Sequence, residues 1–153
     1  MDRIFDVADI SVERLMQEWR WLYPDPVTLL ARSAFGDLFL RKESGQVVKL
    51  NVSIGQITEI AGSEEEFRRL AGTEEWLQEW FANADELAAA QRGLIPNSQR
   101  CIGFKIPLMF AESGAPNNAY LADLYEQVSF LGDLHRQISK LLDGTKVRFV
   151  TEN

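Results

Sequence analysis

Between Ala34 and Phe67, hydrophobic and polar positions alternate in short runs that glycine turns separate. The hydrophobic positions of these runs are Leu38 and Leu40, then Val48, Leu50 and Val52, and then the segment Ile57–Ala61. Phe39 falls on the opposite side of the first run, as a period of two requires. Gly45 and Gly55 supply the positive φ that tight turns between strands often need. The stretch therefore predicts an antiparallel β-meander with one buried face.

Before the meander, apolar residues step at helical spacing. Residues 12–22 form one stripe, and Ser11 is placed to cap the helix that the stripe predicts. The stripe consists of Val12, Leu15, Met16, Trp19 and Leu22. A strand over Val27–Phe35 follows, and a turn at Gly36-Asp37 leads into the meander.

After the meander, capping residues mark the starts of further helices. Ser63 begins an S-x-x-E capping box, which predicts a short helix over 64–71. Thr73 is placed to cap a longer helix that ends at Gly93, and Asn83 and Asp85 weaken its middle, where a break is possible. The apolar stripe of this helix consists of Trp76, Leu77, Trp80, Phe81, Ala84 and Leu87.

The last third of the chain is less regular. Residues 94–119 are punctuated by proline and glycine, and we expect an edge strand over Ile106–Phe110 because Pro107 lacks an amide donor. A strand over Tyr120–Glu126 precedes a helix from Val128 to Leu141, and a short strand over Lys146–Val150 follows. The order of elements predicts a single α+β domain over residues 1–153, an antiparallel sheet with helices packed on it.

The composition shows an excess of acidic residues and indicates the cellular compartment. The chain of 153 residues carries 16 Lys and Arg against 23 Asp and Glu, a net charge of −7. This balance disfavours direct binding of nucleic acid, whose phosphates need basic side chains, and suits a basic protein partner. Cys101 is the single cysteine, so no disulfide forms within the chain. With no signal-peptide core and no run near the ~20 apolar residues of a membrane span, we expect a cytoplasmic protein without a membrane segment.

Residues suited to catalysis are scarce. His135 is the single histidine, and its predicted helix shows no partner for it. An enzyme would need His135 near Cys101 or Asp123, and we rank this interpretation last. The chain has no metal-ligand spacing and no glycine-rich phosphate-binding motif. We therefore expect no enzyme, no cofactor and no metal.

Acidic pairs and tryptophans are the other candidates for function. Runs of acidic residues stand at the predicted helix starts, namely Glu64-Glu65-Glu66, Glu74-Glu75 and Asp85-Glu86. The helix dipole alone explains acids at these positions. The functional alternative is a negative patch that docks a basic protein. Trp19, Trp76 and Trp80 lie on apolar stripes and are expected in the core. Trp21 lies off its stripe and is expected at the surface, which leaves a homodimer open.

An ordered set of short motifs extends over nearly the whole chain. It runs through Trp19-Arg20-Trp21-Leu22, Ala34-Phe35-Gly36-Asp37-Leu38-Phe39, Gly45-Gln46-Val47, Gly55-Gln56-Ile57, Ser63 with Glu66-Phe67, Trp80, Gly93, Cys101, Gly103-Phe104-Lys105, Pro107-Leu108, Gly132, Leu134-His135-Arg136-Gln137-Ile138 and Gly144-Thr145-Lys146-Val147. In this order the set resembles the type VI secretion immunity proteins of the DNase-immunity kind. Their C-terminal domain was long described as a domain of unknown function and often follows a GAD-like domain, which we do not expect here.

The resemblance implies a cytoplasmic immunity protein that binds and neutralises a secreted toxin, expected to be a basic nuclease. The acids that we expect to contact it are Glu74, Glu75, Glu79, Asp85 and Glu86, joined by Glu112, Asn117 and Asn118 of the loop 112–118. The alternative is a non-catalytic regulatory module for a small molecule or peptide, with residues 94–119 lining an apolar cleft.

Overall fold

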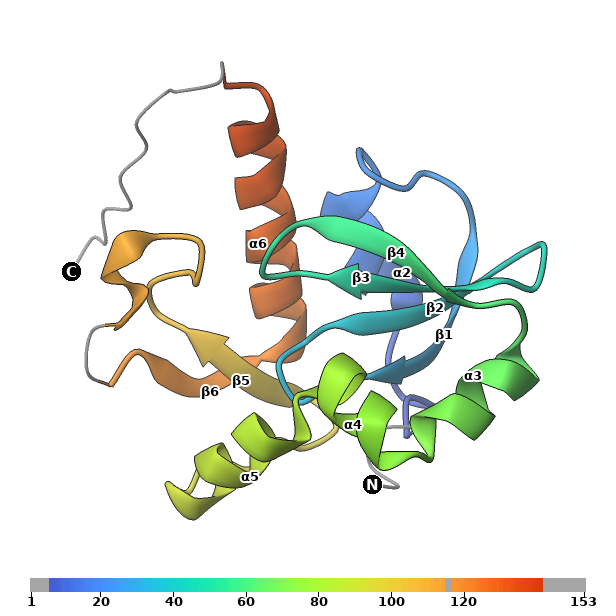
Figure 1. Ribbon diagram of the computed structural model, residues 1–153. Helices are drawn as coiled ribbons and strands as arrows, with labels where there is room; N and C mark the ends of the chain where they lie inside the picture. The colour runs from blue at the N-terminus through green and yellow to red at the C-terminus, as the bar shows by residue number, and fades with distance from the viewer. Residues whose placement is uncertain (1–5, 115–116, 142–153) are drawn as a thin grey trace.

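The computed structural model describes residues 6–114 and 117–141, and the side chains of residues 111 and 112 are not among those described. Its elements in chain order are α2 (Val12–Met16), η1 (Gln17–Trp19), β1 (Val27–Arg32), β2 (Leu38–Lys42), β3 (Val47–Asn51), β4 (Gln56–Ala61), α3 (Glu64–Ala71), α4 (Glu74–Phe81), α5 (Asn83–Gln91), β5 (Arg100–Phe104), η2 (Ala111–Gly114), β6 (Ala119–Asp123) and α6 (Leu124–Ser139). Strands β1 to β4 form an antiparallel sheet in sequence order, and β5 and β6 form a separate antiparallel pair (Figure 1). The predicted α+β class and the meander are confirmed.

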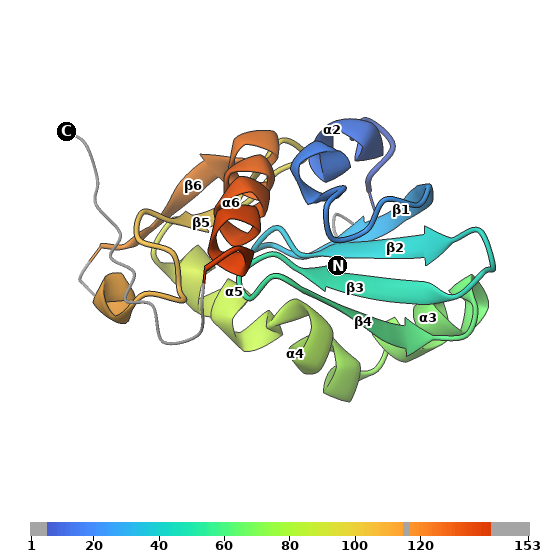
Figure 2. The same cartoon turned by 90° about the horizontal axis from the view of Figure 1, so that it is seen from above.

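The meander is buried on both faces, so the prediction of one buried face is wrong. Leu38, Leu40 and Leu50 point toward α2 and α6, whereas Phe39 and Val47 point toward α3 and α4. In Figure 2 these helices lie on opposite sides of the sheet. The second face is closed by aromatic side chains that include Phe67, Trp80 and Phe81. The predicted alternation of side chains is confirmed, but a strand with apolar residues on both sides needs cover on both sides.

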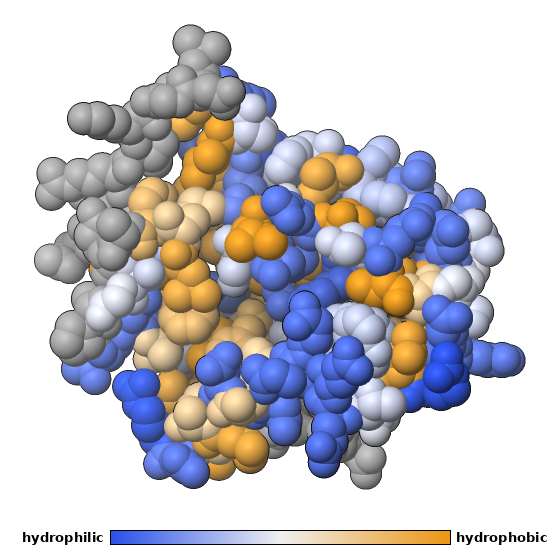
Figure 3. All heavy atoms as spheres, viewed as in Figure 1, coloured by the Kyte–Doolittle hydropathy of each residue, from blue (hydrophilic) through white to orange (hydrophobic). Residues whose placement is uncertain are grey.

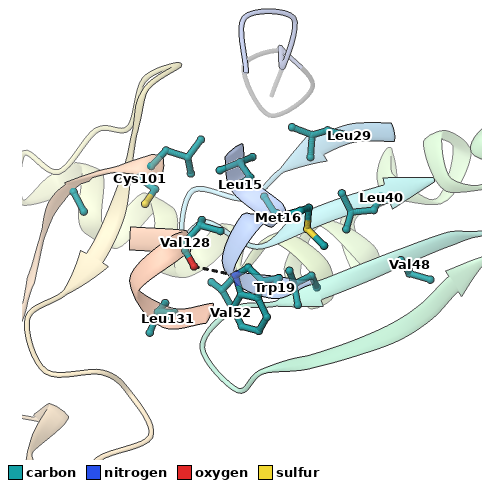
Figure 4. Close-up of a cluster of buried hydrophobic side chains, with 14 residues drawn as sticks. Leu15, Met16, Trp19, Leu29, Leu40, Val48, Val52, Cys101, Val128 and Leu131 are labelled. Carbon is teal, nitrogen blue, oxygen red and sulfur yellow. Dashed lines mark hydrogen bonds between the residues drawn. The ribbon is translucent and has the colours of Figure 1, made fainter. Parts of the chain in front are cut away.

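The first face is packed by α2, η1 and α6. Trp19 is fully buried there, and its Nε1 donates a hydrogen bond of 2.9 Å to the carbonyl oxygen of Val128 (Figure 4). Gly132 permits this close approach of η1 and α6, because a Cβ at that position would lie 2.7 Å from the carbonyl oxygen of Glu18. The core position expected for Trp19 is therefore confirmed. The core positions expected for Trp80 and Trp76 are confirmed on the opposite face of the sheet, where Trp80 is 4 % exposed and Trp76 packs against its cluster.

The caps form largely as expected. The amide of Glu66 donates to Ser63 Oγ at 3.1 Å, and Thr73 Oγ1 accepts from the amide of Trp76 at 3.5 Å. The return bond of the capping box is shifted by one residue, since Glu66 Oε1 accepts from the amide of Gly62 rather than from that of Ser63. The caps therefore set where α3 and α4 begin.

The long helix after Thr73 breaks at Ala82, which has a left-handed φ of 51°. The break separates α4 from α5 and turns the apolar stripe away from the core. Leu87 is consequently 59 % exposed, contrary to its expected inward position. Gly93 stops α5 with a φ of 83°, as predicted.

The segment after α5 departs most from expectation. The edge strand expected over Ile106–Phe110 does not form, and the strand before it is β5. Asn118 explains the difference, because its side chain accepts from the Ile106 amide at 2.7 Å and donates to the Ile106 carbonyl at 2.9 Å. These bonds hold the segment as a loop. The strand expected over Tyr120–Glu126 is β6, which ends at Asp123 because α6 begins at Leu124. The strand expected over Lys146–Val150 lies outside the described residues.

Candidate binding groove

A groove runs between the β3–β4 turn and the helices α4 and α5. It consists of two adjoining cavities, of about 320 Å³ and about 330 Å³, that share Asn51 and Ile54 in their walls. The Trp80 half is also lined by Lys49, Thr58, Glu59, Ile60, Trp76, Glu79 and Trp80. The Asp37 half is also lined by Phe35, Asp37, Ser53, Ala82, Asp85, Phe104, Leu108 and Met109. Figure 3 shows recessed apolar surface between the hydrophilic side chains of α4 and the segment that follows β5.

The β3–β4 turn forms one wall of the groove, and it is held from two directions. Asn51 Oδ1 accepts from the amides of Ser53 at 3.0 Å and Ile54 at 3.2 Å, which closes the turn locally. From α6, His135 Nε2 donates to the carbonyl oxygen of Ser53 at 3.1 Å. Gly55, with a φ of 69°, leaves room for the imidazole, since a Cβ there would lie 2.7 Å from His135 Nδ1. The turn is therefore rigidly placed, and it presents Ile54 with 55 % of its surface exposed.

Burial of His135 lowers the pKa of the imidazole, and the bond to Ser53 partly opposes that shift. The ring also packs on Trp19, with centroids 5.8 Å apart. The imidazole is thus neutral near pH 7 and is engaged on both sides by the fold. Among the hydrogen bonds of the described residues, none joins His135 to Cys101 or Asp123.

Asp37 lies at the bottom of the groove, at the start of β2. Its Oδ1 accepts from the amide of Val52 at 3.1 Å, and its Oδ2 lies 3.7 Å from Lys49 Nζ. Burial raises the pKa of this carboxyl to about 6, because the loss of water outweighs the attraction of Lys49. The carboxylate is therefore ionised near pH 7 at a cost in folding free energy. A carboxyl with its pKa raised in this way is common at functional sites.

The opposite wall comes from the loop 105–110 and from the α4–α5 junction. Asn118 fixes the loop, which leaves Leu108 with 48 % and Met109 with 38 % of their surfaces exposed. The left-handed residue Ala82 redirects the chain so that Asp85, in the first turn of α5, lies on the rim. Exposed apolar side chains therefore face one another across the Asp37 half.

Carboxylates outnumber cations among the residues that line the groove. Asp37, Glu59, Glu79 and Asp85 are the acids, and Lys49 is the lysine that already contacts Asp37. Glu59 also has a partner outside the groove, Lys42 Nζ at 3.6 Å. The groove thus combines apolar walls with a negative potential, a combination suited to a basic partner with apolar contact residues.

The structure places the sequence-predicted contact residues in different environments. Glu79 and Asp85 line the groove, whereas Glu74 and Glu75 are exposed in the first turn of α4. Glu86 is only 5 % exposed, so it does not belong to a surface patch. These acids therefore do not form one continuous cluster, because the chain changes direction at Ala82 and because successive residues of a helix point about 100° apart around its axis.

The predicted loop residues also separate. Asn118 is 8 % exposed and serves the fold through its bonds to Ile106, so it is not a contact residue. Asn117 is exposed with a φ of 60°, and Glu112 lies in η2, where only its backbone is described. Sequence reasoning missed Asp37 and Ile54, whereas Leu108 and Met109 belong to the segment 94–119 that the alternative hypothesis placed along a cleft. Two local signals were available, namely the apolar residue Ile54 beside the glycine turn at Gly55 and the carboxylate of Asp37 directly after Gly36.

Other parts of the structure offer little for catalysis. Cys101 is fully buried, and burial raises the pKa of its thiol to about 12, so no thiolate is present near pH 7. No cluster of three or more His, Cys, Asp or Glu side chains able to hold a metal occurs within residues 6–114 and 117–141. None of the helices in the described part of the chain has the length and apolarity that crossing a bilayer requires.

Comparison with known proteins does not identify a relative, since neither a protein-family model nor a curated protein matches the chain.

Proposed function

We propose that this chain is a binding protein that holds a basic protein partner in the groove between the β3–β4 turn and helices α4 and α5. The observation that carries the proposal is the pairing of exposed Ile54, Leu108 and Met109 with a surplus of carboxylates in one concave surface. Apolar side chains at the centre of an interface supply most of the affinity, and surrounding charges accelerate and orient encounter.

We further propose, in line with the resemblance drawn from the sequence, that the partner is a secreted nuclease toxin and that the chain neutralises it in the cytoplasm. A nuclease needs basic side chains to hold phosphates. An acidic groove competes for that same surface, so binding there excludes the nucleic acid. Such inhibition requires no catalytic group on this chain.

The test begins with a pull-down from the source bacterium, using the full chain as bait and mass spectrometry to identify what stays bound. A one-to-one complex with a basic secreted protein supports the proposal and supplies the toxin for nuclease and growth assays. If the bound protein is acidic, or if the chain leaves its toxicity unchanged, the proposed function is wrong.

A pair of matched variants then tests the groove. Glu79→Lys/Asp85→Lys reverses two groove acids, and Glu13→Lys/Glu43→Lys makes the same change in net charge at exposed acids on α2 and in the β2–β3 turn. We expect the groove variant to weaken binding about 100-fold or more and the control about 3-fold or less, because contact charges act on affinity and distant charges mainly on encounter. Equal losses would place the interface elsewhere.

One observation favours a second candidate, a module that binds a small molecule or peptide. A larger cavity of about 530 Å³ lies between β6 and the first turns of α6, and Arg100, Phe104 and Lys105 line one side of it. Asp123 and Glu126 face them, so the cavity is polar and of mixed charge rather than an apolar cleft. A thermal-shift screen of metabolites and short peptides tests this candidate, with a ligand-dependent rise in Tm as the supporting result.

A further inference from the structure

The Asp37 half of the groove has a shape and chemistry that distinguish it from the Trp80 half. Its walls are Phe35, Ile54, Phe104 and Met109, and its two carboxylates come from Asp37 and Asp85. The volume of about 330 Å³ is enough for one long side chain. An open apolar cavity with one carboxylate at its bottom and a second on its rim is complementary to a side chain with an aliphatic stem and a cationic head.

Arginine fits these walls better than lysine does. The rings of Phe35 and Phe104 are parallel within 2°, with centroids 6.3 Å apart, and both line the cavity. A guanidinium is planar, sheds water more readily than an ammonium, and packs favourably on aromatic surface. It also offers donors in several directions, which suits carboxylates that approach from separate segments, the turn before β2 for Asp37 and α5 for Asp85.

The charged and titratable groups around Asp37 leave a role for an added cation. Lys49 approaches from β3 at 3.7 Å, Asp85 lines the same cavity from α5, and the buried thiol of Cys101 on β5 is neutral. Asp37 keeps only 14 % of its side chain exposed, so water solvates it poorly. A guanidinium in the cavity would stabilise the Asp37 carboxylate, which water solvates poorly, and Asp85 on the rim would offer it a second acceptor.

We propose that the Asp37 half receives a single arginine side chain of the bound protein, with its stem against Ile54 and Met109 and its guanidinium toward Asp37 and Asp85. This inference rests on the proposed function, since it names the side chain that the groove selects. It goes beyond general acidity, because it assigns charge recognition to one pocket and not to the whole surface.

The test uses a small probe, so that it does not depend on the toxin. N-acetyl-arginine amide is titrated into the ¹⁵N-labelled full chain at pH 7.5, and the amide resonances of Asn51, Ile54 and Ala82 are followed. N-acetyl-citrulline amide has the same shape without the charge and serves as the matched probe. We expect saturable shifts at these amides, with the arginine probe binding roughly tenfold more tightly than the citrulline probe. The lysine analogue is expected to bind more weakly than the arginine probe.

Variants locate the site. Asp85→Asn removes a carboxylate from an exposed rim position and is expected to weaken the arginine probe several-fold, whereas Glu75→Gln, on the exposed side of α4, leaves binding unchanged. Equal binding of the arginine and citrulline probes, shifts confined to other amides, or identical affinities for Asp85→Asn and the parent would each overturn the inference. A toxin that still binds under those results would leave the proposed function standing, so the two failures are distinguishable.

Discussion

Two glycine turns of the same sheet have similar sequences and different surroundings. Gly45, between β2 and β3, has a φ of 95° and nothing within 4 Å of the position that a Cβ would take. Gly55, between β3 and β4, has a φ of 69° and lies against the imidazole of His135. The first turn connects two strands, whereas the second is held by α6 and forms a wall of the groove. A turn acquires a functional surface through its tertiary contacts and not through its glycine.

The largest expected effect is on stability at these two glycines. Gly45→Ala costs about 1 to 2 kcal/mol, because an L-residue at positive φ is strained. Gly55→Ala adds the collision with His135 and costs about 2 to 5 kcal/mol in total. Denaturant unfolding at pH 7.5 measures both. Equal losses in the two variants would show that His135 does not hold the second turn.

A double-mutant cycle sharpens this result. His135→Ala removes the ring that the new Cβ would meet, so Gly55→Ala is expected to cost less in that background than in the parent. A coupling of about 1 kcal/mol or more supports the contact. Gly45→Ala serves as the control, because its cost is expected to be the same in both backgrounds.

The next effect concerns Asp37, whose Oδ1 holds the amide of Val52 at the start of the second turn. The pKa of this carboxyl is raised from its ordinary 3.8 to about 6 in the folded state, so the folded state binds more protons than the unfolded state between those values. The contribution of Asp37 to the free energy of unfolding therefore falls as pH rises from about 4 to 6 and stays lower above 6.

Asp37→Asn removes this ionisation and keeps an oxygen for the Val52 amide. We expect it to raise the free energy of unfolding at pH 7.5 by about 1 to 3 kcal/mol and to leave it nearly unchanged at pH 4. Urea titrations at both pH values measure the difference. A gain that is the same at both pH values would contradict the assignment of the cost to the ionised carboxyl.

The smallest effect on stability is expected at Ile54, which the second turn presents to solvent. Ile54→Ala should change the free energy of unfolding by about 0.5 kcal/mol or less, as is usual for an exposed side chain. Its expected effect is on the complex recovered by pull-down, whose affinity should fall about tenfold with the loss of an apolar contact. Ser44→Ala in the first turn is the matched control and should leave the affinity unchanged.

Much of the local structure could be predicted from the chain. The alternation in the meander placed Leu38 and Leu40 opposite Phe39, and the capping residues Ser63 and Thr73 placed the starts of α3 and α4. These features depend on residues a few positions apart, so local spacing is sufficient to specify them. The acidic character that favours a basic partner is likewise a property of composition.

The groove could not be predicted in this way. Glu86 and Asp85 are neighbours on α5, so they point about 100° apart. The left-handed Ala82 sets the direction of α5, and with it which of the two is buried and which lies on the rim. Asparagine is a residue type usually found at the surface, yet the side chain of Asn118 holds the loop that carries Leu108 and Met109. Neither outcome follows from residue type, since each depends on which backbone groups the fold brings near.

By itself, the sequence determined the class of fold, the strands of the meander, the starts of α3 and α4 and the sign of the charge. The tertiary structure alone decided that both faces of the sheet are covered, that Asp37 lies at the bottom of a groove, and that one of two similar turns is fixed. The physical reason is the separation along the chain of the residues that interact. Ser53 and His135 are 82 residues apart, and the hydrogen bond between them places the wall of the groove. Periodicity and capping act between near neighbours, whereas a binding surface is assembled from segments that meet only after folding.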